Sequence, residues 1–229
     1  MKRAYKTVAA APCDGGWSVT LDSRPMRTPA GNPMILPTAK LAAAIAAEWD
    51  AQQDEIRPAT MPLTRLAATA IDRTGPQRSM VVDEVANYAG TDLVCYRAEQ
   101  PAALAARQAA VWQPLIDWAT SRYDAALVAT TGIIPISQSP AARKAFAGAM
   151  AAQDDFRLTA LYALTAGCGS LVIALALLEG RLDAAAAFAA SQLDETFQIE
   201  AWGEDSEALT RRAALAEDLK AAAHFLALL

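Results

Sequence analysis

The hydrophobic periodicity of this 229-residue sequence changes once, near Pro37, and this change constrains the fold more than any other feature. Before it, apolar and polar residues alternate over residues 17–22, which is the period of a half-buried strand. Turn-forming residues follow at 22–25 and at 29–33. After Pro37 the apolar residues recur every third or fourth position, as they do on the buried face of a helix. The pattern therefore predicts strands at the N-terminus and helices beyond it.

We predict an α+β fold in which a small N-terminal antiparallel β-rich domain packs on a larger C-terminal multihelical domain. The first domain covers residues 1–60, with strands to about residue 36 and then a helix, and the second covers residues 61–229. The sequence contains 56 alanines, which favour helices with thin side chains.

The positions of the individual elements follow from the same patterns. Strands are expected near residues 5–8, 17–22, 26–28 and, completing the sheet late in the chain, 93–96. Helices are expected to begin at Thr38, near residue 60, at Pro76 and at Pro101, and then to cover residues 139–151, 154–178, 182–200 and 204–228. Pro114 lies inside the fourth helix, so we expect a kink or a restart at that point.

The sequence has few of the residue types that most enzymes use. Its one histidine, His224, rules out zinc sites built from several histidines. The three cysteines form no CxxC pair, and their odd number is typical of a reducing compartment. The formal net charge of −5 disfavours a nucleic-acid partner. We expect no cofactor, no metal and no catalytic centre.

One uncharged segment, residues 158–178, is as long as a membrane-spanning helix. Gly167-Cys168-Gly169-Ser170 interrupts it, and the flanking Arg157 and Glu179 show no positive-inside bias. We therefore expect a buried hairpin or central helix and no stable membrane insertion; a membrane-attached assembly factor is an alternative that depends on this segment alone. The same glycines match a nucleotide-binding loop poorly, because Val172 stands where the third glycine would be. Close helix packing is the better interpretation.

Carboxylates gather around a predicted helix end, at Asp194, Glu195, Glu200, Glu204 and Asp205. In one interpretation they form the site of a metal-assisted hydrolase. In the other they form a recognition surface, because Trp202 places an aromatic anchor beside the charges. No other part of the sequence assembles a reaction centre, so we prefer the recognition surface.

Several stretches, in their order and spacing, indicate a known family. They are Leu21-Asp22-Ser23-Arg24-Pro25, Thr28-Pro29-Ala30-Gly31, Leu41-Ala42, Glu48-Trp49-Asp50-Ala51-Gln52, Met61-Pro62-Leu63-Thr64, Tyr88-Ala89-Gly90-Thr91-Asp92-Leu93, Trp112-Gln113-Pro114-Leu115-Ile116-Asp117-Trp118, Gly169-Ser170-Leu171, Glu195-Thr196-Phe197-Gln198 and Trp202-Gly203. Together they resemble the assembly chaperones of the F1-ATPase alpha subunit, which occur in mitochondria and related bacteria. The family pattern usually has glycine in place of Ser23, which puts the geometry of that turn in question.

The resemblance implies a molecular chaperone for assembly of the F1 sector of ATP synthase, and not an enzyme. Such a protein binds the unassembled alpha subunit, prevents its aggregation before the alpha-beta hexamer forms, and needs no ATP. The family's eukaryotic members are in the mitochondrial matrix, so a bacterial member is expected in the cytoplasm. The mechanism is physically coherent, because a holding protein that binds more weakly than the native partner is displaced by mass action.

The family-like cluster near the C-terminus indicates which residues contact the alpha subunit. We predict that they are Glu195, Gln198, Trp202, Gly203, Glu204 and Asp205. This chain lacks a longer insert associated with mitochondrial members beyond Trp202, so details of the contact surface transfer less well. Trp49 differs from Trp202, because it lies on one helical stripe with Leu41 and Ile45 and is predicted to pack in the core.

Overall fold

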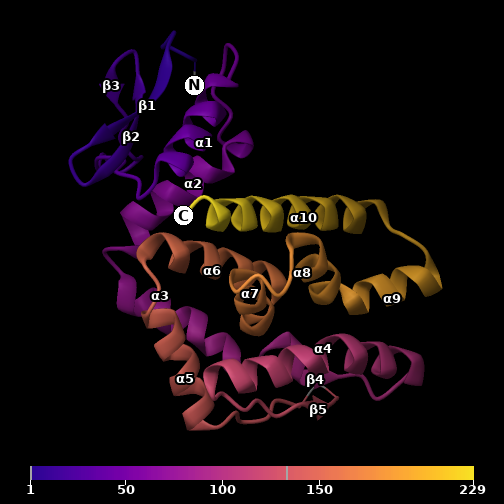
Figure 1. The fold of residues 1–229 in the computed structure, drawn as a ribbon. Helices are drawn as coiled ribbons and strands as arrows, with labels where there is room; N and C mark the ends of the chain where they lie inside the picture. The colour runs from indigo at the N-terminus through magenta and orange to yellow at the C-terminus, as the bar shows by residue number, and fades with distance from the viewer. Residues whose placement is uncertain (1, 133) are drawn as a thin grey trace. The chain divides into compact units, whose positions relative to one another are not determined.

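The computed structural model describes residues 2–132 and 134–229 and groups the chain into two compact units. Unit 1 comprises Met1–Arg78, Asp154–Ala160 and His224–Leu229, and unit 2 comprises Ser79–Gln153 and Leu161–Ala223. The predicted α+β class, with a small antiparallel sheet near the N-terminus followed by many helices, is confirmed (Figure 1). The sequence predicts a first domain of residues 1–60; unit 1 continues to Arg78 and takes in two short segments from late in the chain.

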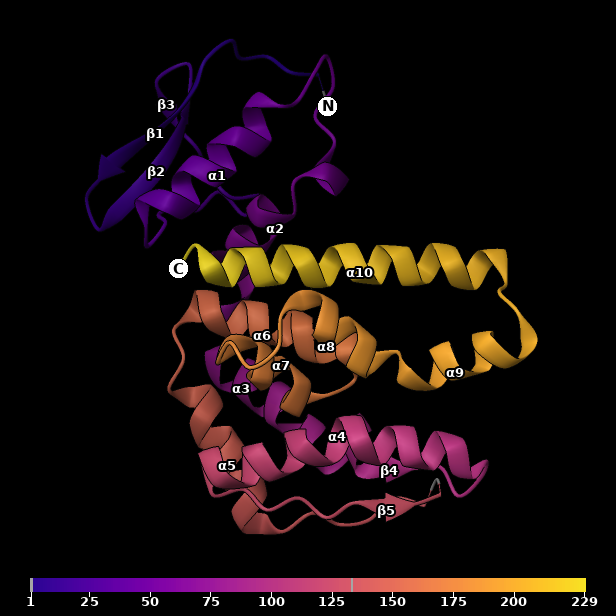
Figure 2. The same cartoon turned by 45° about the vertical axis from the view of Figure 1, so that its right-hand side comes forward.

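Unit 1 is built from a three-stranded sheet and two short helices. Its elements are β1 (Val8–Cys13), β2 (Gly16–Leu21), β3 (Arg24–Pro25), α1 (Ala39–Asp50), a 3-10 turn (Pro58–Thr60), α2 (Pro62–Thr69) and a π-helical turn (Ala70–Thr74). The strands are antiparallel in the order β1-β2-β3, and α1 lies beside the β1-β2 hairpin (Figure 2). The strands predicted at 5–8 and 26–28 are each displaced, to Val8–Cys13 and Arg24–Pro25.

The two hairpin turns of the sheet demand unusual backbone angles. A Cβ on Gly16 would lie 2.4 Å from the carbonyl oxygen of Leu36, so no side chain fits there. In the second turn both Asp22 and Ser23 have positive φ, at 48° and 65°. Ser23 therefore adopts the left-handed conformation that its glycine-preferring position requires, and the turn keeps its geometry at some conformational cost.

Helix α1 connects the sheet to the core of unit 1. Thr38 caps it by accepting a hydrogen bond from the backbone N–H of Leu41 at 3.1 Å, as the sequence predicts. Its buried face, including Leu41 and Ile45, packs with residues of the sheet and with Ala160 and Phe225 from the two late segments. The core of unit 1 is thus assembled from three separate parts of the chain.

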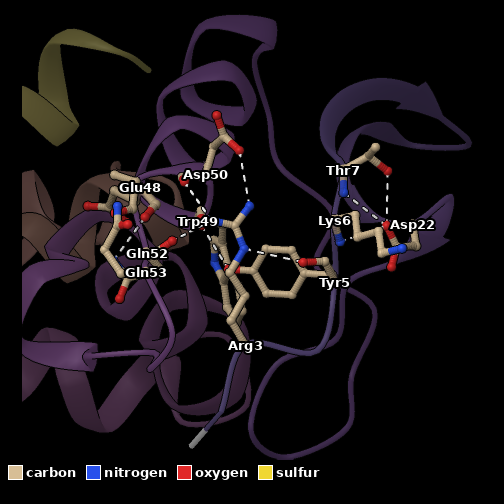
Figure 3. Close-up of polar contacts among 11 residues, drawn as sticks. Arg3, Tyr5, Lys6, Thr7, Asp22, Glu48, Trp49, Asp50, Gln52 and Gln53 are labelled. Carbon is tan, nitrogen blue, oxygen red and sulfur yellow. Dashed lines mark hydrogen bonds and ion pairs between the residues drawn. The ribbon is translucent and has the colours of Figure 1, made fainter.

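The N-terminal residues are tied to the end of α1 by polar contacts (Figure 3). The guanidinium of Arg3 donates to the backbone oxygens of Asp50, at 3.0 Å, and of Gln52, and lies 4.7 Å from the centre of the Tyr5 ring. The Tyr5 hydroxyl donates to the carbonyl of Trp49 at 2.7 Å. These contacts fix residues 3–5 outside the sheet, which is why β1 begins later than predicted.

Unit 2 contains most of the helices. Its elements are α3 (Arg78–Asn87), 3-10 turns at Tyr88–Gly90 and Leu93–Cys95, β4 (Tyr96–Arg97), α4 (Ala102–Tyr123), β5 (Thr130–Thr131), α5 (Pro140–Ala151), most of α6 (Asp155–Cys168), α7 (Leu171–Leu178), α8 (Ala184–Ser191), α9 (Leu193–Trp202) and most of α10 (Ser206–Ala227). Helix α7 is its most buried element, since Leu171–Leu177 are all buried.

The uncharged segment 158–178 folds as two helices, α6 and α7, separated at Gly169 and Ser170. A Cβ on Gly167 would lie 3.2 Å from side-chain carbons of both Leu215 and Leu219 of α10, which confirms the predicted packing role of this glycine. Within the described chain, no helix has both the length and the apolarity to cross a membrane.

Two predictions about unit 2 are wrong, and a third is wrong in part. Residues 93–96 do not complete the first sheet: they form a 3-10 turn followed by β4, which pairs in parallel with β5 in a separate sheet. Of the kink or restart predicted at Pro114, the restart is wrong, because α4 is one helix that includes Pro114. The helix predicted at 182–200 is two helices, because the indole N–H of Trp112 donates to the Ala190 carbonyl that a continuous helix would use itself.

Candidate functional site

The predicted partner-binding residues extend along α9, from Glu195 in its first turn to Trp202 at its end, and through the following turn to Asp205. Gly203 ends α9 with a φ of +88°, and its N–H donates to the carbonyl of Ile199 at 2.9 Å. Two residues later, Asp205 caps α10 by accepting from the N–H of Ala208 at 3.2 Å. Residues 203–205 thus form a short turn between α9 and α10.

The two helices and the turn enclose a small open groove of about 220 Å³. Five of the six predicted residues line it, namely Glu195, Gln198, Trp202, Gly203 and Asp205. Glu204 is exposed in the turn and does not line the groove. Sequence reasoning missed three lining residues, Ile199, Ala208 and Arg211, because nothing in a linear sequence shows which turns of two successive helices face each other.

Trp202 is the most exposed of the large hydrophobic residues in the described chain, with 82% of its surface accessible. It is the last residue of α9 and lines the groove beside Gly203. A tryptophan left this exposed forgoes the burial that usually stabilises its large apolar ring. The ring is therefore available to be covered by another molecule.

The carboxylates that cluster in the sequence point to separate partners in the structure. Asp194 accepts from the side-chain amide of Gln108 at 2.8 Å, and Asp205 is committed to its helix cap. Glu200 forms an ion pair with Arg107 at 2.9 Å, which lowers the pKa of the Glu200 carboxyl. Within the described chain there is no group of three or more side chains that could hold a metal ion. The hydrolase interpretation therefore has no converging set of ligands to support it.

Side chains of α4 contact both α9 and the end of α8. Arg107 pairs with Glu200 and lies 5.3 Å from the centre of the Phe197 ring. Gln108 bonds Asp194 and also accepts from the backbone N–H of Ala98 at 2.7 Å. Trp112 donates to the carbonyl of Ala190 just before α9 begins. These contacts give the groove a fixed wall on the α9 side.

The polar residues of two other family-like stretches have structural roles. Both carboxylate oxygens of Glu48 accept from the first backbone N–H groups of α2, on Leu63 at 2.7 Å and Thr64 at 2.8 Å. Asp92 is fully buried and accepts from the N–H of Val172 at the start of α7. Because Glu48 and Asp92 serve as helix caps, the groove between α9 and α10 is the better candidate for contact with another molecule.

Comparison with known proteins agrees with the resemblance seen in the sequence. The family model described as ATP12 chaperone protein matches residues 2–120. The mitochondrial protein atp12 of Schizosaccharomyces pombe is 24% identical over 233 residues, which cover 96% of this chain and 78% of that protein.

Two solved structures match closely over nearly the whole chain. The crystal structure of Atp12 from Paracoccus denitrificans is 44% identical with a TM-score of 0.95, covering 99% of this chain and 97% of that one. The crystal structure of a candidate chaperone from Agrobacterium tumefaciens is 40% identical with a TM-score of 0.94. That alignment covers 99% of this chain and 85% of the other. Both alignments extend well beyond the residues that the family model matches.

Proposed function

The chain belongs to the ATP12 chaperone family, and we propose on this premise that it assists assembly of the F1 sector of ATP synthase by binding the unassembled alpha subunit. It acts by binding alone, without catalysis and without ATP. It prevents aggregation of the alpha subunit until the alpha-beta hexamer forms. Relatives in a mitochondrion and in bacteria support this proposal, and we place this protein in the cytoplasm of a bacterium.

The physical reason for such a protein lies in the orphan subunit. A subunit made to be buried in a hexamer exposes a large apolar interface until its partners arrive, and such surfaces aggregate. A chaperone that covers this surface with lower affinity than the native neighbour is displaced when that neighbour appears. The energy of release comes from the assembly itself, so no nucleotide is required.

We place the contact at the groove of α9 and α10, with Glu195, Gln198, Trp202, Gly203, Glu204 and Asp205 as the contacting residues. The single observation that carries this placement is the 82% exposure of Trp202 on a fixed helix end. Tryptophan is the residue type most enriched among those that dominate binding energies at protein interfaces. Glu204, which lies outside the groove, would contribute at its rim.

The experiment is a suppression-of-aggregation assay with purified alpha subunit diluted from denaturant, with and without this protein. The wild type should keep the alpha subunit soluble at about stoichiometric amounts. Trp202→Ala should weaken capture at least tenfold, as expected for a central aromatic contact. The fold should be unaffected, because the side chain it removes is exposed.

The matched control is Ile134→Ala, which truncates another strongly exposed apolar side chain, 76% accessible, that does not line the groove. It should capture the alpha subunit as the wild type does. Equal aggregation of the alpha subunit with and without the wild-type protein contradicts the proposed function. Equal losses in Trp202→Ala and Ile134→Ala contradict the placement of the site.

A further inference from the structure

Glu195 lies between two consecutive arginines of α10. Its Oε2 is 3.4 Å from Nη1 of Arg212, and its Oε1 is 3.6 Å from Nη2 of Arg211. The two arginines differ sharply in exposure, with 14% of the Arg212 side chain accessible against 68% for Arg211. The sequence shows an acidic cluster here, but the structure shows that its central carboxylate is already paired.

Arg212 is a fixed part of the fold. Besides Glu195, its guanidinium donates to the side-chain oxygens of Gln192 at 3.2 Å and Thr196 at 2.9 Å. It lies 5.3 Å from the centre of the Phe188 ring. With this many partners in a mostly buried position, Arg212 ties the start of α9 to α10.

Arg211 has a different environment. It lines the groove, and among the described residues its guanidinium is paired with Glu195 alone. The separation of 3.6 Å and the high exposure make this a weak ion pair, screened by solvent and by salt. Its long side chain can leave Glu195 at little cost.

We propose that Arg211 is a displaceable cover on Glu195, and that a lysine or arginine of the bound alpha subunit takes its place. In the free protein both arginines pair with this carboxylate, and only the exposed Arg211 is displaced. In the complex the incoming cation pairs with Glu195, and Trp202, about two helical turns further along α9, packs on an apolar side chain of the same segment. The segment recognised is therefore basic and apolar together, which deepens the proposed function and rests on it.

The Arg211–Glu195 ion pair also affects how readily the alpha subunit is released. Binding must first break the Arg211–Glu195 pair, so part of the attraction between the alpha subunit and the groove is spent on competing with it. The competition lowers the affinity by only about threefold, in the direction that suits a protein that must release its cargo. Specificity rises as well, because a partner without a cation leaves Glu195 covered and gains only the contact with Trp202.

The test is a double-mutant cycle on binding of purified alpha subunit at low ionic strength. Arg211→Gln should tighten binding about threefold, because it removes the competitor. Glu195→Gln should weaken binding, because it removes the partner of the incoming cation. In the Glu195→Gln background, Arg211→Gln should have no further effect, since there is no carboxylate left to uncover. The gain from Arg211→Gln should shrink as salt is added.

Arg122→Gln is the control for net charge, because Arg122 is another exposed arginine, paired with Glu179 outside the groove. It should leave binding unchanged. Weaker binding by Arg211→Gln overturns the inference, since Arg211 would then contact the alpha subunit itself. The inference also fails if Arg211→Gln tightens binding equally in the wild-type and Glu195→Gln backgrounds. It fails as well if Arg122→Gln tightens binding by the same factor, or if no variant changes the affinity.

These outcomes separate the inference from the proposed function. If the wild type binds and Trp202→Ala does not, while Arg211→Gln behaves as the wild type, the groove is the binding site and the cover is absent. If the wild type does not bind the alpha subunit at all, the proposed function fails, and the inference fails with it.

Discussion

The buried carboxylate of Asp92 accepts a hydrogen bond from the backbone N–H of Val172 at 3.0 Å, across 80 positions of the chain. The same carboxylate accepts from the N–H of Val94 at 3.2 Å and bonds Ser170. It therefore joins the 3-10 turn after Asp92 to the start of the central helix α7. This contact explains why residues 93–95 form a turn and not a strand.

Asp92 should make stability depend on pH in an unusual direction. Burial, opposed by its hydrogen bonds, raises its pKa from 3.8 to about 6. Between about pH 4 and 6 the folded state thus holds this proton more tightly than the unfolded state. The Asp92 contribution to the free energy of unfolding is largest below pH 4 and is lost as the pH rises through 6.

The measurement is denaturant unfolding of the wild type and Asp92→Asn at pH 7 and pH 5. The wild type should gain about 1 kcal/mol relative to the variant on going from pH 7 to pH 5. Other titrating groups change both proteins alike and cancel in the difference. A difference that stays constant, or that moves the other way, contradicts the raised pKa.

Ser23→Gly should stabilise the protein. Ser23 has a φ of 65°, which costs a residue with a Cβ but not glycine. Part of that gain is offset by the greater freedom of glycine in the unfolded chain, so we expect a net increase of about 0.5–1 kcal/mol in the free energy of unfolding. Urea unfolding monitored by circular dichroism measures it.

Asp22→Gly is the informative comparison, since Asp22 also has positive φ, at 48°. Its Oδ1 accepts from the backbone N–H groups of Lys6 and Thr7, at 3.0 and 2.9 Å, and from the Thr7 hydroxyl at 3.1 Å. This substitution therefore removes three hydrogen bonds while it relieves the same strain. It should destabilise the protein. If both glycine variants lose stability, backbone strain at Ser23 is not significant.

One thiol of the three should react quickly in the folded protein. Cys13 is exposed, whereas Cys95 and Cys168 are buried, and burial raises the pKa of each buried thiol to about 12. Reactivity follows the thiolate, which is nearly absent at those two positions at neutral pH. A disulfide-exchange reagent should titrate one thiol before unfolding and three after it, and Cys13→Ser should remove the fast one.

Trp49 and Trp202 should respond oppositely to the same substitution. Trp49 packs partly buried against two apolar clusters of unit 1, with its ring 5.7 Å from that of Tyr5. Trp49→Arg should lower the free energy of unfolding by about 2–3 kcal/mol, less than for a fully buried tryptophan, because arginine can extend to solvent. Trp202→Arg should leave stability nearly unchanged. Equal effects of the two substitutions on urea unfolding contradict these environments.

Much of the local structure was predictable from the sequence because its causes are local. The cap at Thr38, the end of α9 at Gly203 and the break between α6 and α7 each depend on residues within one helical turn. The family-like cluster likewise located the groove, since five of its six residues line it. The predictions of local structure that were wrong depend on contacts between distant residues. The turn at residues 93–95 and the end of α8 lie where a side chain bonds backbone far along the chain: Asp92 accepts from the N–H of Val172, and Trp112 donates to the carbonyl of Ala190.

The sequence by itself determined the α+β class, the family and the position of the surface feature at Trp202, because periodicity, composition and ordered motifs are properties of neighbouring residues. The tertiary structure alone decided that the core of unit 1 includes Ala160 and Phe225, and that Glu195 is paired with arginines while Asp194 and Glu200 turn to α4. A sequence shows how many carboxylates a segment contains but not which side chains pair with them. Whether a carboxylate is free to bind a partner depends on which side chains, often distant in the sequence, lie within ion-pair distance of it in the fold.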